Sequence, residues 1–309
     1  MRILKLSPEM QKQLKGWHIT SAPRPRPPWI ILHVPHASTH VPEEYRSDFL
    51  LSYEELQKEH RRLVDHRTDE LFDLAVPHAS KLVAPVSRLL VDVERFEDDA
   101  REPMVTRGMG VLYERTIDGS PLRTIPQGRR EELLERYYRP HHEALTRACD
   151  TALRSRGRAL IIDCHSYPRE TLDCEIHPGT ARPDICLGTA GRHTPDFLVD
   201  VAASACVRAG LSVGQDSPFP GSIVPLRHLD RTPDVMSLMI EVRRDLYLED
   251  SAAWPPARGP RFQEVRGFLT GLVTELARAA QHSGIRVEAA AGGVESGAGA
   301  SAPGEEARP

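Results

Sequence analysis

Apolar runs alternate with amphipathic runs through most of the chain, and this alternation constrains the fold more than any other feature. Short apolar runs bounded by turn residues indicate strands, whereas apolar residues at helical spacing indicate helices. Strands interleaved with long helices predict an α/β fold: a three-layer sandwich around a mostly parallel or mixed sheet. The predicted strands are 29–34, 80–84, 87–93, 159–163, 184–188 and 236–242, and the predicted helices are 53–75, 129–155, 195–209 and 261–281.

The two ends of the chain differ from its body. Residues 1–28 form a basic segment that ends in "SAPRPRPP", which cannot be regular helix. Residues 287–309 are rich in Ala, Gly, Ser and Glu and lack apolar periodicity, so we expect a disordered tail there. Between them, 29–286 is predicted to be a single domain. Gly and Pro cluster at 168–184 and 212–235, which we interpret as long loops near a site.

Composition excludes several classes of partner. The net charge of −4 gives no basic field, which is evidence against nucleic acid or an anionic membrane as a partner. Five cysteines without a CxxC pair argue against a disulfide framework or a thiolate zinc site and favour a reducing compartment. No secretory h-region or apolar run of ~18 residues is present in the sequence, so we expect a cytoplasmic protein of unknown oligomeric state.

Two predicted strands each deliver a histidine to their carboxyl end. The stretch "WIILHVPHAS" ends near His36, and "ALIIDCHSYP" ends on Asp163 and His165. Ligands of open α/β sheets bind beyond the carboxyl ends of the strands, so both histidines could face one crevice. Each has an ordinary structural explanation as well: His36 could cap a turn, and His165 could be a core histidine satisfied by Asp163.

Glu241 has the weakest structural explanation, because it lies inside the apolar run "MSLMIEVRRDLYL" and glutamate is rarely buried without a partner. The other ionisable stretches are "DHRTDELFD", "SRLLVDVERFEDD" and "YYRPHHEAL". Their residues could equally be solvated helix carboxylates (Asp65, Asp69), an ion-pair network (Arg88, Asp92, Glu94, Arg95) or a covered helix surface (His141, His142).

Taken together, these residues predict a metal-dependent amide hydrolase. Two imidazoles and one carboxylate form a catalytic zinc site, with an open position for a water whose pKa falls to ~7. Because Thr39 stands three residues after His36, the pattern His-x-x-Glu is absent, and the carboxylate must come from elsewhere. Asp69 is the predicted ligand, with His66 on nearly the same helix face as its main competitor.

Five motifs in order resemble the N-formylglutamate amidohydrolase family from about residue 29 to about residue 250. They are "VPHAS", "DHRTDELFD", "SRLLVDVER", "YYRPHHEAL" and "IIDCHS". The resemblance implies a phosphorylase/hydrolase-like α/β fold, related to zinc carboxypeptidases and aspartoacylases. It also implies one divalent metal ion per chain, with zinc as the expected ion.

The resemblance further implies roles for individual residues. His36, Asp69 and His165 become the expected metal ligands, and Glu241 becomes the expected base. By analogy with aspartoacylases, Arg88 would polarise the scissile carbonyl and Arg95 would bind the substrate carboxylate. His142 and Arg243 are two further candidate substrate-binding residues.

Some positions depart from the family pattern. Glu94 stands where the family has Asn, which places a negative charge beside the expected carboxylate clamp, and His141 stands where the family usually has Tyr. The expected substrate is a small acidic N-acyl amino acid such as N-formylglutamate. One alternative is a carboxypeptidase-like peptidase or amidase acting on a small or modified peptide. The other is a metal- or ligand-binding protein that has lost turnover, which would not need a buried base at Glu241.

Overall fold

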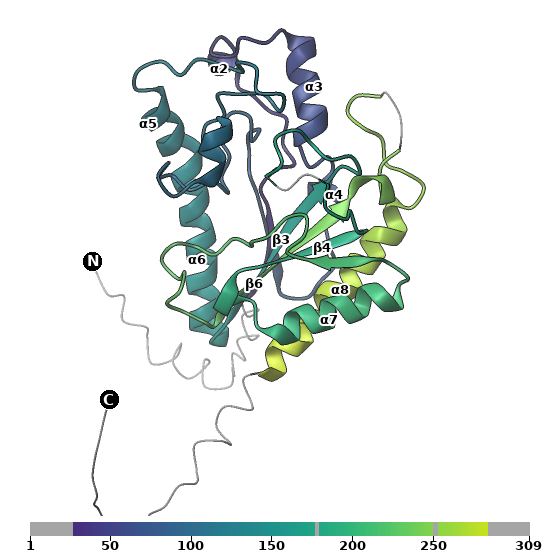
Figure 1. Ribbon diagram of the computed structural model, residues 1–309. Coiled ribbons are helices and arrows are strands. Elements are labelled where there is room, and N and C mark those ends of the chain that lie inside the picture. Colours follow the sequence, from purple (N-terminus) through teal and green to yellow (C-terminus); the bar gives the residue numbers. More distant parts are fainter. Residues whose placement is uncertain (1–26, 177–178, 250–252, 284–309) are drawn as a thin grey trace, which may run out of the picture.

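The computed structural model describes residues 27–176, 179–249 and 253–283 (Figure 1). The predicted C-terminal tail and nearly all of the predicted N-terminal segment therefore lie outside the described residues. No helix within these three ranges is both long and apolar enough to cross a membrane.

A mixed sheet lies at the centre of the molecule. In the described part of the chain it has six strands in the order β2-β1-β3-β6-β4-β5. Strands β2, β1, β3 and β6 run parallel, β4 is antiparallel to β6, and β5 is parallel to β4. The strands are β1 (Ile30–Val34), β2 (Ala79–Val83), β3 (Ala159–Tyr167), β4 (Ile185–Thr189), β5 (Val213–Gln215) and β6 (Val235–Arg243).

Helices cover both faces of this sheet. Helix α6 packs against β1 and β3, while α7 and α8 pack against each other and against β4 and β3 on the other side (Figure 1). The predicted three-layer α/β architecture is therefore confirmed. The helices are α2 (Glu43–Arg46), α3 (Tyr53–Leu63), α4 (Thr68–Leu71), α5 (Arg129–Leu133), α6 (Arg139–Arg156), α7 (Asp196–Arg208) and α8 (Phe262–His282).

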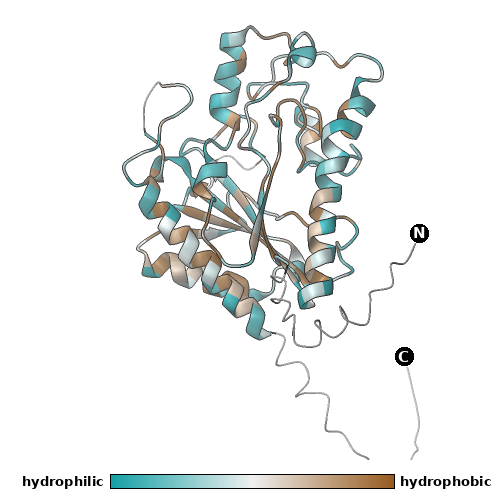
Figure 2. Cartoon of the chain, turned by 180° about the vertical axis from the view of Figure 1, so that it is seen from behind, coloured by the Kyte–Doolittle hydropathy of each residue, from teal (hydrophilic) through white to brown (hydrophobic). Residues whose placement is uncertain are grey.

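The apolar pattern of the sequence explains these layers. All residues of β1 and β3 are buried, as expected for strands covered on both faces. Helix α8 buries Val265, Leu269, Leu272 and Leu276, whose spacing of three and four places them on one face. Figure 2 shows the same division, with apolar strands inside and hydrophilic faces of the helices outside.

A second apolar cluster supports the loops above the carboxyl ends of β1, β3 and β6. Side chains from α2, α3 and α5 pack there against the segment 84–122. Leu89 and Leu90 are fully buried in this cluster, and they belong to the stretch predicted as a strand over 87–93. That prediction is wrong. Residues 87–93 are all described, and they form turns in which Leu90 N and Val91 N both donate to the carbonyl of Ser87.

Two predicted helices are divided. The helix expected over 53–75 is interrupted between α3 and α4, where Arg67 adopts a left-handed conformation with φ of 60°. The helix expected over 129–155 consists of α5, a π-helical segment at Leu134–Tyr138, and α6. The short strand β5 lies within the predicted loop 212–235.

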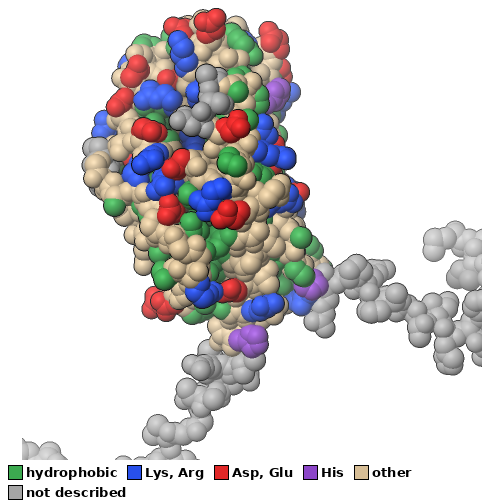
Figure 3. All heavy atoms as spheres, turned by 90° about the vertical axis from the view of Figure 1, so that its right-hand side faces the viewer, with side chains coloured by type: hydrophobic (Ala, Val, Ile, Leu, Met, Phe, Trp, Pro, Cys, Tyr) green, Lys and Arg blue, Asp and Glu red, His purple; other side chains and the backbone are tan. Residues whose placement is uncertain are grey.

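On the face drawn in Figure 3, basic and acidic side chains are interspersed, which agrees with the small net charge of −4.

Candidate active site

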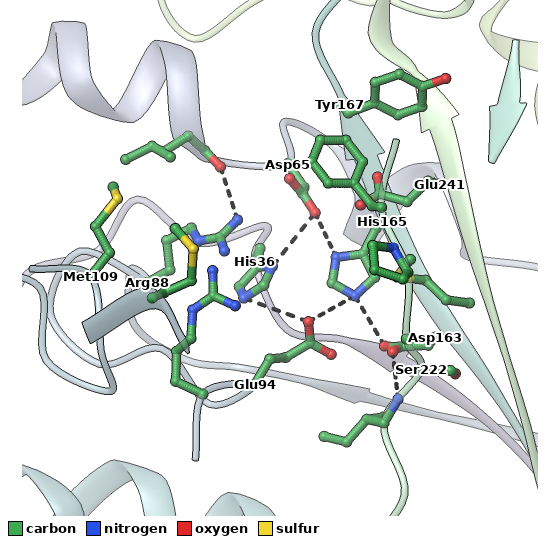
Figure 4. A pocket seen from close by; sticks show the side chains of 18 of the residues that line it. His36, Asp65, Arg88, Glu94, Met109, Asp163, His165, Tyr167, Ser222 and Glu241 are labelled. Atoms are coloured by element: carbon green, nitrogen blue, oxygen red, sulfur yellow. Dashed lines mark hydrogen bonds and ion pairs between the residues drawn. The ribbon is translucent and has the colours of Figure 1, made fainter. Parts of the chain in front are cut away.

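His36 and His165 meet at the carboxyl ends of two adjacent parallel strands. His36 follows β1 and His165 lies near the end of β3. Their ring centroids are 5.0 Å apart, and the two residues are only 2% and 3% exposed (Figure 4). The expectation that these two histidines face one crevice is confirmed.

The carboxylate beside them belongs to Asp65. Its Oδ2 lies 3.1 Å from His165 Nδ1 and 3.7 Å from His36 Nδ1, and its backbone N–H donates to the His36 carbonyl at 2.9 Å. One ligand atom from each of the three residues lies within 4.8 Å of the others. Asp69 sits on α4, where its carbonyl accepts from Lys81 Nζ at 2.8 Å. The structure does not bring Asp69 together with the two histidines.

His66 is buried elsewhere. Its Nε2 lies 3.1 Å from the Arg61 carbonyl, and its ring packs edge-on against Trp254 at 5.4 Å between centroids. Burial lowers the pKa of His66 to about 4. The turn between α3 and α4 separates the candidates, because it directs Asp65 inward. In a continuous helix Asp65 and Asp69 would share a face, so spacing alone could not distinguish them.

Each histidine is oriented by a further carboxylate. His36 Nε2 is 2.8 Å from Asp92 Oδ1, and His165 Nε2 is 3.1 Å from Asp163 Oδ1. Such contacts fix the orientation of metal-binding imidazoles in known sites. They leave the two Nδ1 atoms facing Asp65, and His36 Nδ1 has no hydrogen-bond partner within the described residues. Two imidazole nitrogens and one carboxylate oxygen are ligands that Zn²⁺ takes in catalytic sites, so these residues fit the ion.

A buried chain of histidines lies behind Asp163. His33 Nδ1 is 2.8 Å from Asp163 Oδ1, and His33 Nε2 is 2.8 Å from His141 Nε2. Burial, together with the nearby His33, lowers the pKa of His141 to about 2. Glu94 completes this layer, with Oε2 3.1 Å from His165 Nε2 and Oε1 3.6 Å from His33 Nδ1. The negative charge of Glu94 therefore faces histidines.

Glu241 lines the same cavity as the three residues. On β6 it is in register with His165 on β3, and it is 7% exposed. No hydrogen bond to its Oε2 exists within the described ranges, although the atom is buried. Burial raises the pKa of Glu241 to about 8. Among the described residues, no hydrogen bond to Oε2 offsets the cost of burying this carboxylate. The position of Glu241 inside an apolar run of the sequence had already marked it as costly to bury.

These groups line a cavity of about 520 Å³, and two arginines line it as well. Arg88 Nη2 is 3.0 Å from Asp92 Oδ2, and its Nε donates to the Tyr113 hydroxyl at 3.2 Å. Arg95 Nε is 3.6 Å from the same Asp92 oxygen, beyond hydrogen-bond distance. Burial alone would raise the pKa of Asp92, but His36, Arg88 and Arg95 hold it well below its usual value. Arg88 and Arg95 therefore both interact with Asp92, and a bend of the chain near residue 92 makes this possible.

Of the two remaining predicted substrate-binding residues, His142 lines the cavity and Arg243 does not. His142 lines the cavity, but its Nε2 is bound to the Val93 carbonyl at 2.8 Å. Arg243 is not among the lining residues, and it pairs with Asp184 at 2.8 Å and Asp245 at 2.7 Å.

Arg244 lines the cavity instead of Arg243. Its Nη2 lies 3.2 Å from Asp65 Oδ1 and 3.2 Å from the Ser166 carbonyl. The direction changes because β6 ends at Arg243 and a 3₁₀ turn begins at Arg244. The sequence offered no signal for this one-residue change, since the two arginines are adjacent and chemically identical.

One family model and two solved structures are similar to this chain. The model of the N-formylglutamate amidohydrolase family matches residues 29–248. The N-formylglutamate amidohydrolase from Ralstonia eutropha JMP134 has a similar fold, with a TM-score of 0.70 and 23% identity over 84% of this chain and 97% of that chain. Gene product Atu2144 from Agrobacterium tumefaciens is also similar, with a TM-score of 0.57 and 20% identity over 82% and 92% of the two chains. No curated protein matches the chain. The match over residues 29–248 shows that the chain belongs to the N-formylglutamate amidohydrolase family.

Proposed function

We propose that the protein is a metal-dependent amidohydrolase that cleaves the amide bond of an N-acyl amino acid such as N-formylglutamate. Membership of the family supports the amidohydrolase class. One observation carries the finer proposal: Glu241, whose buried Oε2 has no hydrogen-bond partner among the described residues, lines the same cavity as the group of His36, Asp65 and His165.

His36, Asp65 and His165 would hold one divalent ion, and zinc is the ion that this donor set suggests. When bound, Zn²⁺ supplies a Lewis acid that polarises a carbonyl and makes water more acidic. The protein contributes the orientation of the ligands, through Asp92 on His36 and Asp163 on His165. Asp65 takes the place that the sequence assigned to Asp69.

Glu241 would act as the general base. It accepts a proton from the water that attacks the carbonyl carbon, and it later returns that proton to the departing amine nitrogen. Burial raises the pKa of Glu241 above that of an exposed glutamate, which makes its ionised carboxylate a stronger proton acceptor. Asn or Gln could not do the same, because an amide does not take up a proton in this range.

Arg88 and Arg95 would bind the two charged parts of the substrate. Arg88 is held by Asp92, Tyr113 and a backbone carbonyl, which gives it the fixed position that stabilises a developing oxyanion. Arg95 lies 3.6 Å from Asp92 without a hydrogen bond from its Nε in the part of the chain that the structure describes, so its guanidinium would be the one to bind a substrate carboxylate. His142, already bound to a carbonyl, would contribute only its ring to the wall.

The proposal is tested by metal removal and an amine-release assay. The purified protein is stripped with a chelator, reloaded with Zn²⁺, and assayed on N-formylglutamate, N-acetylglutamate and a glutamyl dipeptide. We expect amine release from the N-acyl substrates by the reloaded protein alone. Equal activity of the stripped protein would contradict metal dependence. Cleavage of the dipeptide alone would favour a peptidase, and no release from any substrate would contradict the proposed reaction.

We also infer a cytoplasmic location and small-molecule rather than nucleic acid or membrane partners. All five cysteines are free and buried, and the net charge is −4. Both features accord with a reducing compartment and with a small substrate.

A further inference from the structure

The cavity extends beyond the charged cluster along an apolar wall. The wall belongs to the segment 218–229, where Phe219, Ile223, Leu226 and Leu229 are among the lining residues. The volume of about 520 Å³ falls within the range of ~300–1,000 Å³ that encloses drug-sized ligands. N-formylglutamate is smaller than such ligands, so it would leave much of the wall without a contact.

The wall is fixed to the site by hydrogen bonds. The Ile223 N–H donates to Asp163 Oδ2 at 2.9 Å, and the Ser237 hydroxyl donates to the Ile223 carbonyl at 2.7 Å. The Phe219 ring packs edge-on against Tyr167, with 5.5 Å between centroids. Because Asp163 also binds His165, a single carboxylate separates the wall from the metal-binding group.

The arginines lie on the other side of that group. Arg95 pairs with Asp92, which binds His36, whereas the segment 218–229 is joined through one carboxylate to His165. Figure 4 shows this order, with Arg88 on one side of the two histidines and Ser222 and Tyr167 on the other. Arg88 and Arg95 therefore lie on one side of the metal-binding group, and the segment 218–229 lies on the other.

This order determines where each part of a substrate lies. When the carboxylate of an N-acyl amino acid binds Arg95, its amide lies at the metal-binding centre and its acyl group points toward the segment 218–229. A formyl group carries no carbon chain that could cover this segment. We propose that the preferred substrates are N-acyl amino acids whose acyl group is apolar and longer than formyl. The inference rests on the amidohydrolase function proposed above and names its substrate class.

The mouth of the cavity continues the apolar surface. Leu226, on the segment 218–229, lines this cavity and is 48% exposed, so the wall reaches solvent there. A chain of several carbons would remain in contact with apolar side chains along this path.

A series of acyl groups on one amino acid tests the proposal. The Zn²⁺-loaded protein is assayed on N-formyl-, N-acetyl-, N-butanoyl- and N-hexanoylglutamate, and glutamate release is measured. Burying one methylene is worth about fourfold in kcat/KM, so we expect kcat/KM to rise from acetyl to hexanoyl. A value that is highest for formyl and falls with each added carbon would overturn the inference while leaving the amidohydrolase function intact. No release from any member would contradict the function itself.

Two variants of exposed residues test whether the preference for longer acyl groups depends on the segment 218–229. Leu226→Asn alters the wall at its mouth, whereas Val207→Asn alters an equally apolar residue on α7 that is 68% exposed and does not line the cavity. We expect the ratio of kcat/KM for hexanoyl over formyl substrate to fall several-fold in Leu226→Asn and to stay constant in Val207→Asn. The same ratio in both variants would contradict a role for the segment 218–229.

Discussion

His165 and Glu241 are register partners on the adjacent parallel strands β3 and β6. Side chains of register partners lie on the same face of a sheet, so the imidazole and the carboxylate emerge side by side into the cavity. Of the two, His165 is bound by Asp65 and Asp163, whereas Glu241 Oε2 has no hydrogen-bond partner among the described residues. The sheet thus presents an imidazole held by two carboxylates and a carboxylate oxygen without a hydrogen-bond partner, side by side in the part of the chain that the structure describes.

Glu241→Gln should lower kcat by ~100-fold or more, which is the usual contribution of acid–base catalysis. The substitution is nearly isosteric and removes only the capacity to take a proton. Metal content should be unchanged, because Glu241 is not in the group of His36, Asp65 and His165. Steady-state kinetics and elemental analysis of the same preparation check both parts. Glu264→Gln, on the exposed face of α8, is the control. Turnover equal to that of the control would eliminate the role of Glu241.

Asp65→Asn and Asp69→Asn should separate the two candidate metal ligands. We expect Asp65→Asn to purify with little metal, because its Oδ2 faces both histidine Nδ1 atoms. Asp69→Asn should retain the metal, since Asp69 contributes a backbone carbonyl to Lys81. Metal per chain, measured by elemental analysis, decides between them. The opposite pattern would restore the assignment made from helix spacing, and His165→Ala should be metal-poor in either case.

Arg95→Ala and Arg88→Ala should affect different kinetic constants. Loss of Arg95 removes uniform binding of a substrate carboxylate, so KM should rise while kcat changes little. Loss of Arg88 removes stabilisation of the oxyanion, so kcat should fall by ~100-fold. Michaelis–Menten kinetics on the best acidic N-acyl substrate measure both. Small and equal effects would mean that the two arginines serve only as ion-pair partners of Asp92.

The strands that carry the site could be predicted because their signal is local. Apolar runs at 29–34, 159–163 and 236–242 correspond closely to β1, β3 and β6. Parallel strands bring their carboxyl ends to one edge of a sheet, so the positions of His36 and His165 at the ends of two such runs were enough to predict that they meet. The predicted loops at 168–184 and 212–235 also contribute residues to the cavity.

The rest depends on contacts between distant segments. Leu89 and Leu90 have the apolarity of a strand, yet they pack into the cluster under α3 and α5 and never reach the sheet. Asp65 rather than Asp69 faces the two histidines because the chain turns between α3 and α4, where Arg67 adopts a left-handed conformation that its residue type does not predict. Arg244 lines the cavity where Arg243 was expected because β6 ends between them.

His60→Gln should make stability less sensitive to acid. His60 is 4% exposed, its Nε2 lies 2.9 Å from the Ser87 hydroxyl, and burial lowers its pKa to about 4. Between pH 6.5 and pH 4 the unfolded chain takes up a proton at this position that the folded chain does not, so stability falls as the pH falls through this window. From pH 7 to pH 5 the free energy of unfolding should drop by about 2 kcal/mol more in the wild type than in His60→Gln. Gln can still bond Ser87, which keeps the comparison specific to titration. Urea denaturation at both pH values measures the difference, and identical pH dependence in the two proteins would show that His60 does not titrate with a lowered pKa.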